Sequence, residues 1–489
     1  MTLDPEPAAS GLSGPPVPRA GLARSSAIFA SGAIAGKLVG VLMLPVLVRN
    51  LSTADFGRLD VLSTMVSAAV SALLIGLELA ALRLYPDSPP ARRRSLHASW
   101  YLLSTGMVLP FSIGLIALSR PVSRALFDRP DYALGVAMVG LTTLVGTWLV
   151  IGLTILRSQH RAGAYAGVTA GSLLLNAVLT VILLLHWRAG VGAVLVAMAI
   201  SQGAGALVSG WLVRKEAVGR PTAHAGKALL RLALPLAPAV VATWVGEFGN
   251  RAILLATRGP EEVGYLSLAV RFGSVGMLVV SAFHNAWQPQ AFALGSDREA
   301  LSRLAPDARK IVVTVCTAVV ALALVSPEVA VIVAGRRYVP ALPAIGFELL
   351  FAMGAGLYLV ATMPSSLARR TGDLSIAGCV AVAVTVGLNL ALSGPAGSGG
   401  SAAAMAGGQL AGVGVALGFG RARLPTEIQW ARLSALAMLT SLIVCAACLP
   451  DGGSPVWARL VMGCIFAGLV SREAVARNTV LRFSSRLLN

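Results

Sequence analysis

Apolar blocks long enough to cross a membrane recur along this chain from residue 26 to about residue 470. Roughly 20 apolar residues, each rising about 1.5 Å along a helix, span the hydrocarbon core of a bilayer. The polar segments between the blocks are too short to fold alone, and only 12% of the residues are charged, about half the proportion usual in soluble proteins. We therefore predict an all-α, polytopic membrane protein of about 14 transmembrane helices.

The blocks divide the chain into two groups of six spans and a final pair. We predict a disordered cytoplasmic tail at 1–21, an N-lobe with spans 1–6 at 22–214, a cytoplasmic linker at 215–231, a C-lobe with spans 7–12 at 232–420, spans 13–14 at 421–471, and a basic cytoplasmic tail at 472–489. Within this plan, span two is predicted as one helix over 58–84, and spans eleven and twelve over 374–392 and 402–419.

Basic residues orient the chain in the membrane. A net charge of +18 would raise the question of nucleic-acid binding in a soluble protein. Here most Lys and Arg lie in short loops, such as residues 92–94, and cytoplasmic loops of membrane proteins are enriched in these residues. Both termini are therefore expected in the cytoplasm, and no nucleic acid is expected as a partner.

A short sequence following the first span has a counterpart in the second half of the chain. Residues 51–57 read LSTADFG, and residues 259–264 read GPEEVG. The spacing indicates a duplicated half. Ser52 and Asp55 also have the spacing of a capping box, which predicts a short amphipathic turn at the outer surface.

Cations inside the predicted spans are the main candidates for substrate binding. Lys37 lies near the midpoint of the first span, and Arg251 and Arg271 lie in spans seven and eight. A cation in the hydrocarbon costs roughly 3 kcal/mol on insertion scales, so it should face a polar interior. Arg binds phosphate oxygens with two parallel hydrogen bonds, whereas Lys acts as a point charge. Snorkelling or a pair with Glu78 is the alternative for Lys37, and a pair with Glu247 is the alternative for Arg251.

Two carboxylates and three prolines complete the predicted site. Glu78 and Glu247 are candidates for ion coupling or for charge pairing, because a carboxylate buried in a membrane exchanges protons readily near neutral pH. Pro45, Pro235 and Pro238 are candidates for hinges, because proline interrupts the helical hydrogen-bond ladder.

Patterns for metal binding and catalysis are missing from the sequence. The five histidines are scattered without an HExxH arrangement, no GxxxxGK phosphate loop is present, and the five cysteines lie inside predicted spans. We expect no metal, no cofactor and no enzymatic activity.

Several short segments together resemble a known family of exporters. They are Leu44-Pro45 followed by the 51–57 segment, the 76–78 segment GLE with the 83–85 segment RLY, and Asn250-Arg251 ahead of the 259–265 segment GPEEVGY. From about residue 21 to residue 449 the chain is similar to the multidrug, oligosaccharidyl-lipid and polysaccharide (MOP) exporter superfamily, and within it to the polysaccharide-biosynthesis flippases. The family often has Asp where Asn250 stands, so a charge is missing beside Arg251, and Glu247 is the carboxylate one turn away.

The resemblance implies two six-helix lobes related by pseudo-two-fold symmetry, with two extra C-terminal helices, in the cytoplasmic (inner) membrane. It implies a flippase that moves lipid-diphosphate-linked oligosaccharide to the outer leaflet, by alternating access through a cationic central cavity, for cell-surface polysaccharide or lipopolysaccharide biosynthesis. The implied partners are the polyprenyl-diphosphate-linked oligosaccharide, the lipid bilayer, a polysaccharide polymerase and glycosyltransferases.

Two other functions compete with this prediction. A multidrug or cation antiporter of the same superfamily would need acidic residues in the cavity. A membrane glycosyltransferase or ligase would usually present a long extramembrane loop with catalytic acids, and the predicted loops are short.

Overall fold

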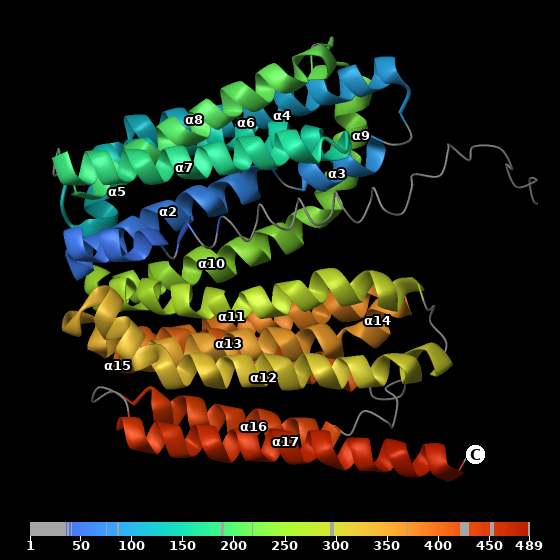
Figure 1. The fold of residues 1–489 in the computed structure, drawn as a ribbon. Helices are drawn as coiled ribbons and strands as arrows, with labels where there is room; N and C mark the ends of the chain where they lie inside the picture. The colour runs from blue at the N-terminus through green and yellow to red at the C-terminus, as the bar shows by residue number, and fades with distance from the viewer. Residues whose placement is uncertain are drawn as a thin grey trace, which may run out of the picture.

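The structure is a computed structural model that describes residues 36, 39–40, 42–74, 76–85, 88–186, 190–217, 219–293, 298–368, 370–420, 430–449 and 454–487. Every regular element in these residues is a helix (Figure 1). Nine of the helices in the described ranges are long and apolar enough to cross a membrane. A bilayer offers no water to the backbone, and helices satisfy their polar groups internally. The predicted all-α, polytopic membrane fold is confirmed.

The first half of the chain forms one bundle (Figure 1). A helical stretch at 42–50 leads into α2 (Thr53–Leu74). The remaining helices of this half are α3 (Leu77–Leu84), α4 (Pro90–Ala117), α5 (Ser119–Phe127), α6 (Ala133–Ser158), α7 (Ala162–His186), α8 (Gly190–Ala217) and α9 (Ala223–Ala233). Helices α6, α7 and α8 pack on one another, and α2 lies against α6 and α8.

The second half forms another bundle, followed by a C-terminal helix pair. Its elements are the 3₁₀ turn η1 (Leu234–Leu236), α10 (Ala237–Arg258), α11 (Pro260–Ala293), α12 (Arg298–Ala334), the 3₁₀ turn η2 (Arg336–Ala341), α13 (Leu342–Ala361), α14 (Met363–Leu367) and α15 (Thr371–Gly420). The final pair, α16 (Trp430–Ala447) and α17 (Val456–Leu487), lies along α12 and α13. Helix α15 is kinked at Gly397, whose φ is 56°. The kink falls between the predicted spans eleven and twelve.

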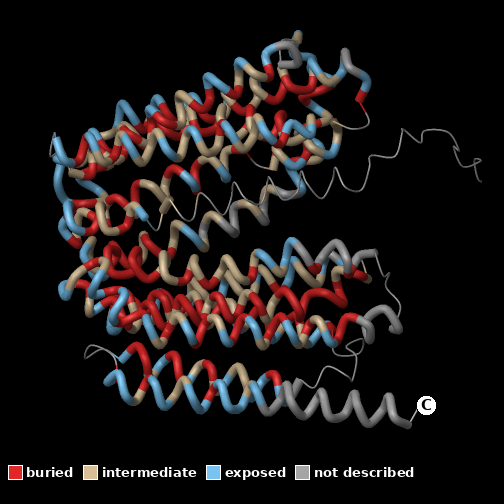
Figure 2. The backbone as a smooth tube through the Cα atoms, in the orientation of Figure 1, coloured by how far each residue is buried: buried red, intermediate tan, exposed pale blue. Residues whose placement is uncertain are grey.

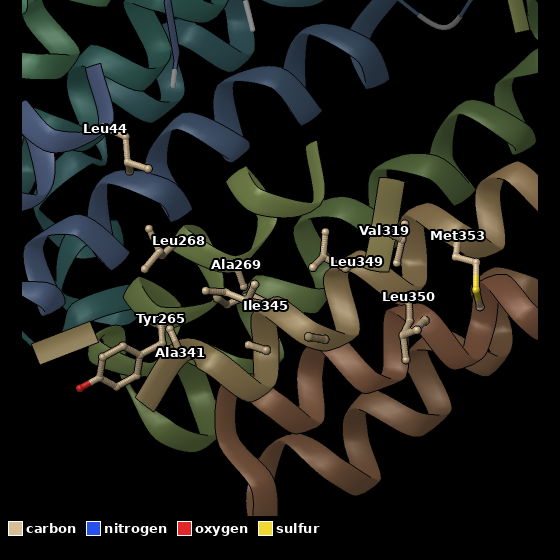
Figure 3. Close-up of a cluster of buried hydrophobic side chains, with 14 of the residues drawn as sticks. Leu44, Tyr265, Leu268, Ala269, Val319, Ala341, Ile345, Leu349, Leu350 and Met353 are labelled. Carbon is tan, nitrogen blue, oxygen red and sulfur yellow. The ribbon is translucent and has the colours of Figure 1, made fainter. Parts of the chain in front are cut away.

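Buried residues lie mainly where the helices of a bundle pack against one another, and exposed residues lie toward its outside (Figure 2). The exposed surface includes large apolar residues such as Leu207, Trp457 and Leu442. In water such residues would be a liability, whereas against acyl chains they are well solvated. A large buried cluster extends from the first half into the second, where Leu268, Val319, Ile345 and other apolar side chains join α11, α12 and α13 (Figure 3).

The two halves meet where α2 packs against α10 and α11. A Cβ atom on Gly57 of α2 would lie 1.8 Å from the carbonyl oxygen of Pro260, so only glycine fits there. Gly264 of α11 is in the same position against Thr53, with 2.2 Å between an added Cβ and the Thr53 carbonyl oxygen. When the 51–57 and 259–264 segments are aligned, Gly57 matches Gly264 and Thr53 matches Pro260. The contact is therefore reciprocal, as a pseudo-two-fold axis between duplicated halves requires.

The capping box is present, but it starts α2 itself. The Asp55 backbone N–H donates to Ser52 Oγ at 3.0 Å, and Ser52 Oγ donates to Asp55 Oδ2 at 2.8 Å. The predicted separate turn is therefore wrong: Ser52 caps a continuous helix of 22 residues.

A further prediction of local structure is corrected. Span two is not one helix over 58–84, because Gly76 adopts a left-handed conformation (φ 74°) that separates α2 from α3; glycine adopts it without a steric penalty. Most of the amphipathic helix α9 falls within the predicted linker at 215–231, and Thr222 caps this helix by accepting from the Ala225 N–H. Thr222 is also tied to α4, since its backbone N–H donates to Ser99 Oγ at 3.0 Å.

Candidate functional site

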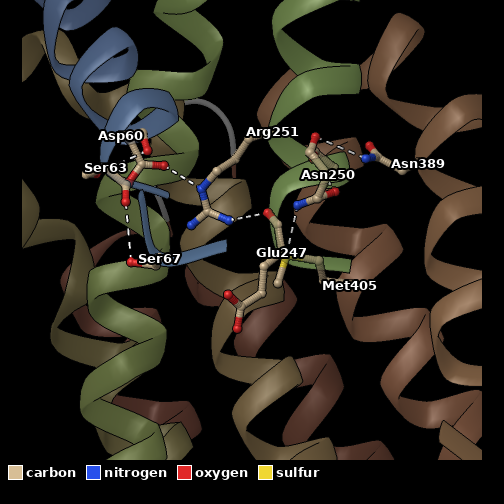
Figure 4. A network of polar contacts seen from close by, with 9 residues as sticks. Asp60, Ser63, Ser67, Glu247, Asn250, Arg251, Asn389 and Met405 are labelled. Atoms are coloured by element: carbon tan, nitrogen blue, oxygen red, sulfur yellow. Dashed lines mark hydrogen bonds and ion pairs between the residues drawn. The ribbon is translucent and has the colours of Figure 1, made fainter. Parts of the chain in front are cut away.

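A buried ion pair joins the two halves of the protein. Asp60 lies two turns into α2, and Arg251 lies on α10. Arg251 Nε donates to Asp60 Oδ2 at 2.6 Å, and the two side chains are 9% and 13% exposed (Figure 4). Because both charges are withdrawn from solvent, each depends on the other for compensation.

Glu247 does not form the ion pair that the sequence offered to Arg251. The guanidinium instead donates from Nη1 to the backbone carbonyl oxygen of Glu247 at 2.9 Å. The Glu247 side chain is exposed, and its carboxylate points away from Arg251 (Figure 4). Asp60 thus takes the place predicted for Glu247.

Glu348 of α13 is a second buried carboxylate near this pair. It is 3% exposed and interacts electrostatically with Arg251 and Asp60. Its Oε1 atom has no hydrogen-bond partner among the described residues. A Cβ on Gly273 would lie 3.0 Å from the Glu348 Cβ, so this glycine lets α13 approach α11 closely.

Arg271 lies on α11, close to the same cluster. Its guanidinium carbon is 5.4 Å from the ring centroid of Phe56, and it is attracted by Asp60 and repelled by Arg251. The Nε atom of Arg271 is buried without a hydrogen-bond partner in the described part of the chain. Arg271 therefore retains donor capacity for an anion.

Buried carboxylates accompany the predicted cations Arg251 and Arg271 in the described part of the chain. Asp60 and Glu348 face Arg251 and Arg271 within the described residues. Lys37, the third predicted cation, lies outside the described residues.

Glu78 belongs to a separate polar site at the other end of the first half. It lies in the first turn of α3, where its Oε1 accepts from Arg157 Nη2 at 2.7 Å and from Thr154 Oγ1 at 3.1 Å. The Arg157 and Glu78 side chains are 40% and 37% exposed. The partner of Glu78 is therefore Arg157 of α6, and this ion pair is only partly buried.

The Glu78–Arg157 pair borders a recess that we call the Arg157 cavity. Its volume is about 550 Å³. It is lined by Val70, Ser71, Leu74, Gly76, Glu78, Leu79, Leu82, Val150, Arg157 and Val240. Val240 belongs to α10, so the cavity lies at the boundary of the two halves.

A second recess, which we call the Gln202 cavity, lies between α2, α6, α7 and α8. Its volume is about 480 Å³. It is lined by Val66, Ser67, Val70, Ser71, Gly146, Leu149, Val150, Leu153, Thr169, Ser172, Leu173, Asn176, Met198, Ser201 and Gln202. Val70, Ser71 and Val150 line both cavities, so the two adjoin.

Asn250 lies in a neutral polar cluster inside the second half. Its Oδ1 accepts from Ser401 Oγ at 2.9 Å, and its Nδ2 donates to Met405 Sδ at 2.9 Å. Asn389 Nδ2 donates to the Asn250 carbonyl oxygen at 3.1 Å (Figure 4). An amide satisfies these contacts without the desolvation penalty that a carboxylate would add.

The three predicted hinge prolines occupy different settings. Pro45 lies within the helical stretch 42–50, and Pro235 lies in the 3₁₀ turn between α9 and α10. Pro238 is in the first turn of α10, where the missing N–H leaves no helical hydrogen bond unmade. Only Pro235 coincides with a break between helices.

Sequence reasoning missed Asp60, Glu348 and Arg157. Asp60 and Glu348 are carboxylates inside predicted spans, and that signal alone marks a candidate functional residue. Arg157 lies at the end of a predicted span, where a basic residue is usually attributed to the positive-inside rule.

This arrangement matches solved membrane transporters. The structure is similar to the lipid II flippase MurJ in an inward closed conformation, with a TM-score of 0.67 and 13% identity over 94% of this chain and 100% of that one. It is also similar to a MATE transporter in complex with MaL6 (TM-score 0.59, 18% identity, 86% and 97% coverage). A MOP superfamily transporter from Pyrococcus furiosus gives a TM-score of 0.58 at 18% identity, with 85% and 96% coverage. A comparison with curated protein sequences finds no match.

Two bundles joined through α2, α10 and α11 thus define a multi-pass membrane fold, which is the fold of these transporters. A family profile described as "Polysaccharide biosynthesis protein" matches residues 22–293, more than half of the chain. The protein belongs to this family.

Proposed function

We propose that the protein is a flippase for lipid-diphosphate-linked oligosaccharide, which it moves from the inner to the outer leaflet for cell-surface polysaccharide or lipopolysaccharide biosynthesis. The observation that carries the proposal is the Arg157 cavity, which has a guanidinium in its wall and lies between the two halves of a polysaccharide biosynthesis family member. Arg suits diphosphate because its planar donors match phosphate oxygens. A solved structure of similar fold is itself described as a lipid II flippase.

The mechanism we propose is alternating access. The reciprocal contact of Gly57 and Gly264 and the Asp60–Arg251 pair hold the halves together at the Thr53 end of α2. The Arg157 cavity lies at the other end, beside Gly76 and Glu78. In the proposed cycle the head group enters this cavity, the halves rock, and the polyprenyl tail stays in lipid. Pro45, Pro235 and Pro238 are the proposed hinges.

We also propose where the protein is located and how its chain is divided into functional units. The protein lies in the cytoplasmic (inner) membrane with both termini in the cytoplasm, next to a polysaccharide polymerase and glycosyltransferases that supply or use its substrate. The functional units are the two lobes at 22–214 and 232–420, the linker between them, and the spans at 421–471. It acts as a transporter without enzymatic chemistry of its own.

The test is translocation in liposomes by the purified protein. A fluorescent polyprenyl-diphosphate oligosaccharide in both leaflets is exposed to an impermeant quencher after incubation, with and without ion gradients. We expect the protein to increase the accessible fraction above that of protein-free liposomes. Equal fractions in the two samples under every gradient would rule out the flippase.

A cation antiporter is the second candidate, and the structure adds an observation in its favour. Asp60 and Glu348 are buried carboxylates near the boundary between the halves, as an organic cation or a coupling ion would require. Expression in a drug-sensitive host separates the two functions. An antiporter raises resistance to cationic drugs, whereas the proposed flippase leaves it unchanged.

A further inference from the structure

The Arg157 and Gln202 cavities form one recess with two chemically different ends. They share Val70, Ser71 and Val150. One end carries the charged pair Glu78–Arg157, and the other end carries uncharged hydroxyl and amide side chains among apolar ones. Helices α7 and α8, which supply most of these polar side chains, lie side by side in the first half (Figure 1).

We propose that this recess is a two-part substrate site: Arg157, released from Glu78, binds the diphosphate, and the Gln202 cavity binds the attached saccharide. The inference rests on the flippase function proposed above and assigns its head group to particular residues. The side chains that would recognise the diphosphate and the saccharide all belong to the first half, away from the Asp60–Arg251 pair.

Glu78 holds the position that a substrate anion would take. Its carboxylate accepts a 2.7 Å hydrogen bond from Arg157, and Thr154 donates to the same oxygen. More than a third of each charged side chain is exposed, so water screens the ion pair and its net strength is small. A diphosphate carries more charge and offers more oxygens than one carboxylate, so it can displace Glu78 from the guanidinium.

The Gln202 cavity offers hydrogen-bonding groups that suit sugar hydroxyls. Asn176 Nδ2 reaches Ser201 Oγ in a long contact of 3.3 Å. The hydroxyl oxygens of Thr169 and Ser172 have no hydrogen-bond partner among the described residues. Both oxygens are buried, so rotation of the Thr169 and Ser172 side chains is needed to turn them toward a hydroxylated ligand, with which they then gain hydrogen bonds without requiring charge.

The order of the two ends agrees with a head group entering from the α3 side. Glu78 and Gly76 border the Arg157 cavity, whereas Val66 and Ser67 border the Gln202 cavity. On α2 the Gln202 cavity is lined from Val66 to Ser71 and the Arg157 cavity from Val70 to Leu74, so the Gln202 cavity lies about one turn nearer the Thr53 end. In this arrangement the saccharide lies deeper, and the diphosphate follows it near the lipid tail.

Binding of two probes tests the charged end. The probes are geranyl diphosphate and its N-acetylglucosaminyl ester, titrated into the full-length protein in nanodiscs. We expect Arg157→Ala to weaken both probes about ten- to hundred-fold, the range for a hydrogen bond to a charged group. Glu78→Gln should tighten both by up to about five-fold, because it removes the competing carboxylate.

A double variant shows whether Glu78 acts through Arg157. In the Arg157→Ala background, Glu78→Gln should change the affinity of neither probe, since the competition no longer exists. Arg157→Lys serves as the folded, charge-conserving control and should retain part of the affinity. If Glu78→Gln has the same effect in both backgrounds, or if Arg157→Ala binds as the wild type does, the assignment of Arg157 is overturned.

Gln202→Leu and Asn176→Leu test the neutral end. Each should weaken the sugar-bearing probe about two- to ten-fold and leave geranyl diphosphate unchanged, because only the saccharide reaches these side chains. Equal effects on the two probes overturn the saccharide assignment. These failures are distinct from failure of the flippase proposal, which would appear as no translocation by the wild-type protein.

Discussion

The buried pair between Asp60 and Arg251 leads to a quantitative prediction. Removing one member of a buried ion pair leaves an uncompensated charge and costs about 3–5 kcal/mol. Both side chains here are at most 13% exposed and their atoms are 2.6 Å apart, so solvent relieves little of this penalty. We expect Asp60→Ala or Arg251→Ala to lower the free energy of unfolding by about that amount.

The double variant distinguishes a charge effect from a packing effect. When Asp60 and Arg251 are both replaced by Ala, neither member of the pair is left without the other, so the loss should be smaller than the sum of the two single losses. The assay is unfolding of the purified protein in mixed micelles as the proportion of denaturing detergent is raised.

An exposed ion pair on α12 provides the control. Lys310 Nζ lies 2.9 Å from Asp307 Oδ1, and these side chains are 60% and 45% exposed. Asp307→Ala should therefore change stability by about 1 kcal/mol or less. Equal losses for Asp60→Ala and Asp307→Ala, or additive losses in the Asp60 and Arg251 double variant, would refute this reasoning.

Three further predictions concern the close approach at Gly57, the ion pair of Arg459, and Lys37. Gly57→Ala places a Cβ 1.8 Å from the Pro260 carbonyl oxygen and should lower unfolding free energy by about 1–3 kcal/mol, whereas Gly163→Ala, with open space around it, should not destabilise the protein in the same assay. Arg459→Ala removes the ion pair with Glu328 and the 2.9 Å hydrogen bond to the Leu324 carbonyl, which together join α17 to α12. This variant should be cleaved faster by protease in the segment before α17, without losing membrane insertion. Lys37→Ala should abolish translocation in liposomes while the amount of inserted protein stays unchanged, and normal flipping by this variant would contradict the role given to Lys37.

Several features of the fold were predictable from the sequence, because each depends on neighbouring residues. The lengths of the apolar blocks predicted membrane-spanning helices, and the Ser52–Asp55 spacing predicted a cap. The break at Gly76 was not predicted, because a glycine inside an apolar run is compatible with a continuous helix until packing selects the left-handed conformation.

The partners of the charged residues were less predictable. Glu247 has the right spacing for Arg251 along one helix, but Asp60 from the other half takes the guanidinium. Glu78 pairs with Arg157, which follows it by many residues in the chain. In each case the partner comes from another helix, so no local spacing could identify it.

By itself, the sequence determined that the chain crosses a membrane as helices, because a backbone surrounded by lipid must satisfy its own hydrogen bonds over a length set by the bilayer. It also carried the repeated segment that becomes the reciprocal Gly57 and Gly264 contact. Only the tertiary structure decided which charges neutralise one another and where cavities remain. The reason is that a buried charge is stabilised by whichever opposite charge the packing of helices brings within hydrogen-bond distance, and that packing depends on the whole surface of each helix.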